Sequence, residues 1–109
     1  MAAARKKKEP FQDELKIYEK AISTYGKANQ LTMVLEETSE LQKEICKILR
    51  GEGDVDHLAE EYADVEITMS QVLVMFRKQG LAKRVKEWRA KKLARLAERL
   101  KDEEKERPQ

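Results

Sequence analysis

The sequence has few of the residues that interrupt helices or cross-link chains. It contains one cysteine, four glycines and two prolines among 109 residues, and aromatic residues make up only 6%. A single cysteine, Cys46, excludes an intrachain disulfide, so we expect a reducing, cytoplasmic compartment. No apolar run approaches the roughly 18 residues that a membrane span needs, and no apolar segment follows the basic cluster at 5–8. We therefore expect neither a membrane partner nor a secretory signal.

Charge is what the sequence has in abundance, and it is segregated along the chain. Charged residues make up 40% of the total, although the formal net charge is only +2. Residues 36–66 hold eleven acidic and three basic side chains, whereas residues 82–101 hold nine basic and two acidic ones. An acidic segment beside a basic one suits a site that holds cations and a polyanion together. For any single charge, a solvated helix face is the alternative explanation.

The spacing of apolar residues predicts an all-α protein with four helices. Apolar side chains recur every three or four residues over about 11–25, 30–50, 55–79 and 81–101. Glycines fall at the expected breaks, at positions 26, 51, 53 and 80. We predict that Asn29 or Thr32 caps the second helix and that Asp54 or Asp56 caps the third.

Short connections favour antiparallel neighbours, as in a four-helix bundle. We divide the chain into a flexible basic tail (1–10), one all-α domain (11–101) and a charged tail (102–109). The apolar stripes are nearly heptad-like, which also predicts packing between subunits, so we expect a homo-oligomer, either a dimer or a tetramer.

Acidic residues beside the apolar stripes are the most informative feature. Glu37, Glu40 and Glu44 share one face of the second predicted helix, and Glu61 and Asp64 stand three apart on the third. Each of the pairs 37/40 and 61/64 directly precedes positions of an apolar stripe. If the two helices pack antiparallel, four carboxylates face each other across a groove.

Clustered carboxylates raise each other's pKa values and oppose folding unless a cation is present. Oxygen ligands without histidine or cysteine select Mg²⁺, Mn²⁺ or Ca²⁺. A carboxylate-bridged di-iron site fits poorly, because such bundles use Glu-x-x-His pairs. The only histidine is His57, and the residue three positions before it is Asp54 rather than a glutamate. Either spaced pair of acids alone also occurs by chance on exposed helices.

The strings Glu36–Leu41 (EETSEL) and Glu60–Val65 (EEYADV) resemble the paired E-x-x-E and E-x-x-D signature of the MazG-like all-α nucleoside triphosphate pyrophosphohydrolases. The resemblance extends over about 18–100 and includes Asp64–Gln71 and Lys91–Leu96. It implies Mg²⁺-dependent hydrolysis of (deoxy)nucleoside triphosphates to the monophosphate and pyrophosphate, with Mn²⁺ as a substitute. The metal-binding and catalytic carboxylates it implies are Glu37, Glu40, Glu61 and Asp64.

Basic residues of the fourth predicted helix are candidates for binding the triphosphate. Lys92 and Arg95 match the family-like tail and share a helix face, and Lys83 and Arg84 are further candidates, with Lys47 and Arg50 on the second helix. Other residues have lesser predicted roles. Glu36 and Glu60 lie at the surface or support the ligands, and Glu44 supports the ligands. Trp88, Tyr62 and Tyr18 belong first to the core, with stacking on a base as the alternative.

Two other classes of function stay open. A nucleic-acid-binding module would use the basic fourth helix and the N-terminal basic cluster, but no recognised binding motif supports it. A structural helical bundle without catalysis would use the acids only as surface charge. Another enzyme also stays open: the sequence resembles the phosphoribosyl-ATP pyrophosphohydrolases of the same superfamily. The segment Lys91–Leu96 is less similar to that branch. The residues leave open the base and sugar preference, the number of metal ions and the phosphorus that is attacked.

Overall fold

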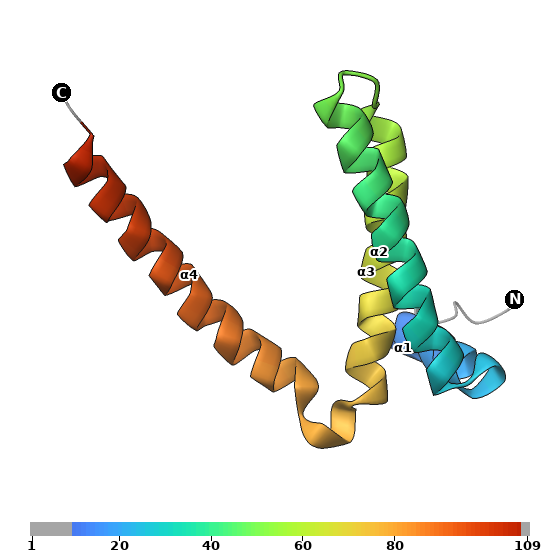
Figure 1. The fold of residues 1–109 in the computed structure, drawn as a ribbon. Coiled ribbons are helices and arrows are strands. Elements are labelled where there is room, and N and C mark those ends of the chain that lie inside the picture. Colours follow the sequence, from blue (N-terminus) through green and yellow to red (C-terminus); the bar gives the residue numbers. More distant parts are fainter. Residues whose placement is uncertain (1–9, 108–109) are drawn as a thin grey trace, which may run out of the picture. The chain divides into compact units, whose positions relative to one another are not determined.

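The computed structural model describes residues 10–107, with side chains from residue 13 onward, and in this part of the chain every regular element is helical. The predicted all-α class is confirmed. The described residues fall into two compact units that divide after Met75. The elements are α1 (Pro10–Tyr25), α2 (Lys27–Leu49), α3 (Val55–Met75), a 3₁₀ turn η1 (Arg77–Gln79) and α4 (Leu81–Glu106) (Figure 1).

Gly26 separates α1 from α2, as the sequence predicted. Its φ of 89° lies in the left-handed region, where a residue with a Cβ is strained. The predicted side-chain cap of α2 is wrong, because the helix begins at Lys27 without one. Asn29 and Thr32 instead donate hydrogen bonds back to the carbonyl oxygens of Tyr25 and Ala28, at 2.7 and 2.9 Å.

Two glycines, Gly51 and Gly53, shape the tight turn that connects α2 and α3. Gly51 has a φ of 76°, and a Cβ on Gly53 would lie 2.6 Å from a side-chain carbon of Ile48. Asp54 caps α3, since its Oδ1 accepts the backbone N–H of His57 at 2.9 Å. That hydrogen bond holds the pKa of Asp54 below its ordinary value. A turn this short makes α2 and α3 antiparallel neighbours.

Gly80 ends η1 in the left-handed conformation and starts α4, in agreement with the predicted break. The fourth helix runs five residues further than predicted, to Glu106 rather than residue 101, so most of the predicted charged tail is helical. The N-terminal basic cluster, at 5–8, and the side chain of Phe11 lie outside the described residues. None of the described helices holds an apolar stretch long enough to cross a membrane.

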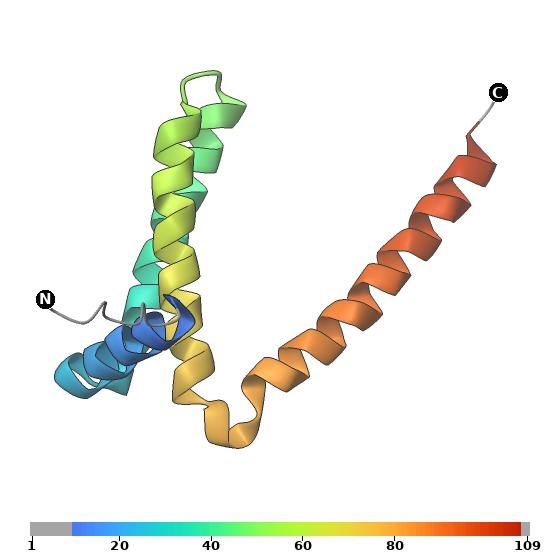
Figure 2. The same cartoon turned by 180° about the vertical axis from the view of Figure 1, so that it is seen from behind.

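Within the first unit, α2 and α3 lie side by side along most of their length, and α1 crosses them near the start of α2 and the end of α3 (Figures 1 and 2). The face of α3 toward α2 is mostly polar. It carries an inner line of residues at spacings of three and four, namely Glu61, Asp64, Thr68, Gln71 and Met75, which are buried or half-buried. On α2, Gln30, Glu37 and Glu44 recur every seven residues and are likewise buried or half-buried.

This polar contact corrects the predicted core. The expected apolar stripe of α3 forms an outer line one residue further on, at Tyr62, Val65, Met69 and Val72, of which Val65 and Val72 are half-buried. Tyr62 is 58% exposed and Met69 46% exposed. On α2, Leu35 and Leu49 are 71% and 81% exposed. Met75 at the end of α3, 7% exposed, is the one buried apolar residue in the described part of the chain. The described residues of the first unit, taken by themselves, therefore leave several large apolar side chains exposed.

Candidate metal centre

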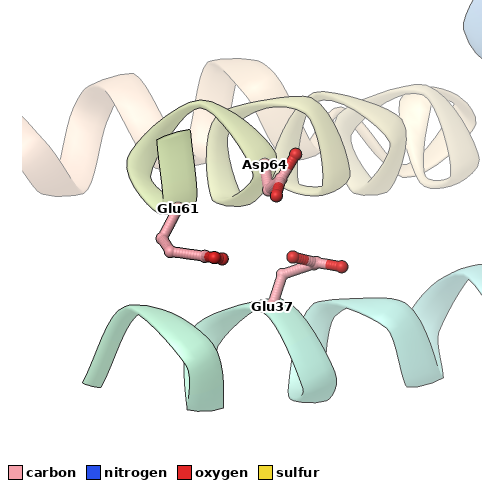
Figure 3. A group of neighbouring side chains, drawn as sticks. All are labelled: Glu37, Glu61 and Asp64. Atoms are coloured by element: carbon pink, nitrogen blue, oxygen red, sulfur yellow. The ribbon is translucent and has the colours of Figure 1, made fainter. Parts of the chain in front are cut away.

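Three of the four predicted metal ligands meet between α2 and α3. Glu37 points from α2 toward Glu61 and Asp64 on α3, as Figure 3 shows. Each residue offers one carboxylate oxygen, and these oxygens all lie within 4.8 Å of one another. The antiparallel pairing explains the meeting, because two acids three apart on one helix face the turn of the other helix that carries Glu37.

The electrostatics of the cluster oppose its full ionisation. Partial burial raises the pKa of Glu37, and the charges of Asp64 and Glu61 raise it further. Partial burial also raises the pKa of Glu61, followed by the charges of Asp64 and Glu40. Raised carboxyl pKa values signal negative charge that the protein itself does not compensate, which is the condition that a bound cation relieves.

Glu40, the fourth predicted ligand, does not join the cluster of three. Its side chain is 51% exposed and forms an ion pair with Lys43 at 3.7 Å. Its charge still contributes to the raised pKa of Glu61, so it lies on the same side of the α2–α3 contact. Glu36 and Glu60 are exposed, as predicted, and each adds to the raised pKa of the acid that follows it.

Glu44 is more deeply placed than the sequence suggested. The residue is only 8% exposed, and its Oε1 accepts a hydrogen bond from the Lys47 ammonium at 3.1 Å. Its Oε2 is buried and has no hydrogen-bond partner among the described residues. The Glu44 charge also raises the pKa of Glu61. A buried carboxylate oxygen without a hydrogen-bond partner is costly, even though Lys47 pairs with the other oxygen of Glu44.

A buried amide pair, which sequence reasoning missed, fixes the register of α2 against α3. Gln30 Nε2 donates to Gln71 Oε1 at 2.6 Å, across 41 residues of sequence. Thr68, one turn from Gln71, is also buried and donates to the Val65 carbonyl oxygen at 2.9 Å. The available signal was the spacing, because Gln30 and Glu37 are seven residues apart and Asp64 and Gln71 are seven residues apart.

The geometry of the three carboxylates fits a small, hard divalent cation. Mg²⁺ binds oxygen at about 2.1 Å, so two ligand atoms on opposite sides of the ion lie about 4.2 Å apart. Adjacent ligand atoms lie only about 3.0 Å apart, so the oxygens of Glu37, Glu61 and Asp64, which lie within 4.8 Å of one another, would move closer together to bind one ion. No histidine or cysteine belongs to the cluster, which favours Mg²⁺, Mn²⁺ or Ca²⁺ over zinc.

The predicted triphosphate-binding residues lie on α4, in the second unit. Lys83 forms an ion pair with Glu87 at 4.0 Å, and the Arg84 side chain donates to the Gln79 carbonyl oxygen at 3.0 Å. Lys92 and Arg95 are exposed. The remaining basic candidates are already paired, since Lys47 binds Glu44 on α2 and Arg50 binds Glu52 in the turn that follows α2.

The aromatic residues depart from the prediction that they belong to the core. Trp88 is 53% exposed, and the Lys91 ammonium lies 4.9 Å from its ring centroid. Tyr62 is likewise exposed, and only Tyr18 is half-buried.

Comparison with known proteins adds no relative: no protein-family model, curated protein or solved structure matches the chain.

Proposed function

We propose that this protein is a cytoplasmic, Mg²⁺-dependent nucleoside triphosphate pyrophosphohydrolase of the MazG-like kind. The observation that carries the proposal is the cluster of Glu37, Glu61 and Asp64, whose oxygens lie within 4.8 Å on two facing helices. The resemblance of the two sequence motifs to that family supports it independently. Both lines of reasoning use the same residues, although one starts from geometry and the other from sequence.

In this proposal, Glu37, Glu61 and Asp64 hold the cation, and Glu40 joins them once its ion pair with Lys43 opens. A bound Mg²⁺ supplies Lewis-acid polarisation of a phosphoryl oxygen and lowers the pKa of a coordinated water. A carboxylate of the site would orient that water by accepting a hydrogen bond from it. Lys92, Arg95, Lys83 and Arg84 are our candidates for neutralising the triphosphate.

Pyrophosphate release tests this activity. Wild-type protein is incubated with a panel of ribo- and deoxyribonucleoside triphosphates, with Mg²⁺, with Mn²⁺ and with EDTA. We expect metal-dependent release that Glu61→Gln abolishes and that Glu66→Gln, an exposed acid on the same helix, leaves intact. Absence of release from every nucleotide with either metal would remove the proposal.

We further propose that the protein self-associates as a dimer or a tetramer. The outer line of α3 and the exposed leucines of α2 are the supporting observation, since large apolar patches on a soluble protein typically mark contact surfaces. Sedimentation at micromolar concentration tests this, with the double variant Tyr62→Ser/Met69→Ser as comparison. We expect wild type above monomer mass and the variant shifted toward monomer, and a monomeric wild type contradicts the proposal.

A second candidate function is nucleic-acid binding through α4. Residues 76–107 hold thirteen basic and six acidic side chains, and α4 is exposed along nearly its whole length. Electrostatic binding to DNA or RNA predicts an affinity that falls steeply with salt and needs no divalent metal. A filter-binding titration at two salt concentrations, with and without EDTA, distinguishes this function from the metal-dependent one.

A further inference from the structure

A groove of about 480 Å³ lies on the first unit, close to the carboxylates but distinct from them. The last residue of α1 and the first two turns of α2 contribute most of its lining, which comprises Tyr25, Asn29, Gln30, Thr32, Met33 and Glu36. Its volume lies in the range of small-molecule sites. Glu36 directly precedes Glu37, and Met33 lies one helical turn earlier, about 6 Å along the axis.

The walls of the groove are held by hydrogen bonds within the unit. The Asn29 amide nitrogen donates to the Tyr25 carbonyl oxygen at 2.7 Å, which fixes the end of α1 against α2 beside Gly26. The buried Gln30 lines the groove and is tied to Gln71 on α3 at 2.6 Å. The Tyr25 ring, in contrast, is 61% exposed. An exposed aromatic ring on a fixed backbone is suited to stack against a planar ligand.

The groove keeps both free donors and free acceptors, and Glu36 supplies the only charge of its lining. The Asn29 amide uses one of its two N–H groups on the Tyr25 carbonyl oxygen, so its second N–H and its carbonyl oxygen are left for a ligand. The Thr32 hydroxyl donates to the Ala28 carbonyl oxygen at 2.9 Å and keeps its lone pairs. Glu36 adds a carboxylate. The negative charge of Glu36 repels phosphate and attracts N–H and O–H groups of a ligand.

We infer that this groove binds the nucleoside part of the substrate and favours bases that carry an amino group. The inference rests on the proposed function, because the polyphosphate would be held at the neighbouring cation. Guanine matches best, since its adjacent N1–H and N2–H₂ donors suit the Glu36 carboxylate. Adenine and cytosine offer one amino group each. Uracil and thymine lack an amino group and offer one N3–H donor between two carbonyl acceptors, so they match the Glu36 carboxylate worst. Tyr25 and Met33 contact the face of the base.

Isothermal titration of the full chain with α,β-methylene analogues of guanosine and uridine triphosphate, in Mg²⁺, tests the inference. We expect the guanosine analogue to bind about fivefold tighter or more. Tyr25→Ala should weaken both analogues about tenfold, while Tyr25→Phe keeps the ring and retains binding. Glu36→Gln should remove the preference for guanosine, and the control Glu66→Gln should leave it unchanged. Inorganic tripolyphosphate, which lacks a nucleoside, should bind Tyr25→Ala as it binds wild type.

The outcomes separate this inference from the proposed function. If the analogues bind in a metal-dependent way but neither Tyr25→Ala nor Glu36→Gln changes their affinity, the inference about the groove is wrong. The proposed metal centre is unaffected by that result. The inference is also wrong if Tyr25→Ala weakens the binding of tripolyphosphate as much as it weakens the binding of the analogues. In that case the substitution would not act through contact with the base. If wild type binds neither the analogues nor tripolyphosphate in Mg²⁺, both proposals fall.

Discussion

Neutralising one acid of the cluster should change stability in opposite directions with and without metal. In Glu37→Gln the amide keeps nearly the shape of the carboxylate but removes its charge. Without a divalent cation we expect the variant to be more stable than wild type, because repulsion from Asp64 and Glu61 is relieved. With saturating Mg²⁺ we expect the order to reverse, because wild type gains a ligand that the variant binds poorly.

The size of the effect follows from the geometry. Two unit charges 4.8 Å apart, the largest separation in the cluster, repel by about 1 kcal/mol at the dielectric constant of water and by about 3.5 kcal/mol at an effective value of 20. Glu37 is half-buried and partly screened by solvent, so we expect the lower end, about 1 kcal/mol. In a domain of this size that shifts Tm by about 4–8 °C.

Thermal unfolding followed by circular dichroism at pH 8, in EDTA and in increasing Mg²⁺, measures both effects. At Mg²⁺ concentrations 100 times Kd, wild type should gain about 2.7 kcal/mol. Glu66→Gln is the matched control, an exposed acid on α3 outside the cluster, and should follow wild type in both conditions. The reasoning is refuted if Glu37→Gln is less stable than wild type in EDTA, or if Mg²⁺ raises Tm equally in both proteins.

Three further predictions follow from the same contacts. The pKa values of Glu37 and Glu61 are raised in the folded state, so the native protein binds more protons than the unfolded chain. In EDTA, the free energy of unfolding should therefore fall as the pH rises from about 4.5 through the raised pKa values. The stabilisation by Mg²⁺ should grow over the same pH range. Tm measured against pH, with and without Mg²⁺, tests both effects. Gln71→Leu leaves the Gln30 amide unpaired and should cost about 1–3 kcal/mol in urea unfolding, and the double variant Gln30→Leu/Gln71→Leu should recover much of that loss. Glu40→Gln should weaken Mn²⁺ binding, measured by titration calorimetry, less than Glu61→Gln does, since Glu40 lies outside the cluster of three.

The helices and their ends were largely predictable because they depend on local chemistry. Gly26 and Gly80 adopt positive φ values, which few other residues tolerate, and Asp54 supplies the oxygen that caps α3. The α2 cap was missed for a local reason too. Asn29 and Thr32 are good capping residues, but they also bond readily to carbonyl oxygens of the preceding turn, and here they do so. Composition does not decide between these two uses.

Which face of α3 meets α2 was not predictable in the same way. Periodicity identifies an apolar stripe, but it does not say whether the stripe faces a neighbouring helix of the same unit or another surface. The inner line that contacts α2 is displaced by one residue from the apolar stripe, so its members are mostly polar. The burial of Glu44 and the Gln30–Gln71 pair follow from this register, and the seven-residue spacing to Glu37 and Asp64 is the only sign of the pair in the sequence.

The sequence identified residues that meet in the candidate site, but it did not predict the orientation of every side chain. Glu37, Glu61 and Asp64 meet as the antiparallel pairing required. Glu40 stands three residues from Glu37 and shares its face, yet its side chain pairs with Lys43 on the next turn. Spacing along a helix fixes where a Cβ lies, whereas the rotamer of a long side chain depends on partners that spacing alone does not rank.

The one-residue offset between the two lines of α3 connects the proposed metal centre to the proposed assembly. Tyr62 and Val65 of the outer line directly follow Glu61 and Asp64 of the inner line. A second copy that covers the outer line would therefore also displace water from beside the carboxylates. Lower local polarity makes uncompensated charge more costly and a bound cation more favourable. Because coupling between two binding events is reciprocal, a cation that stabilises the cluster should favour association to the same extent that association strengthens cation binding.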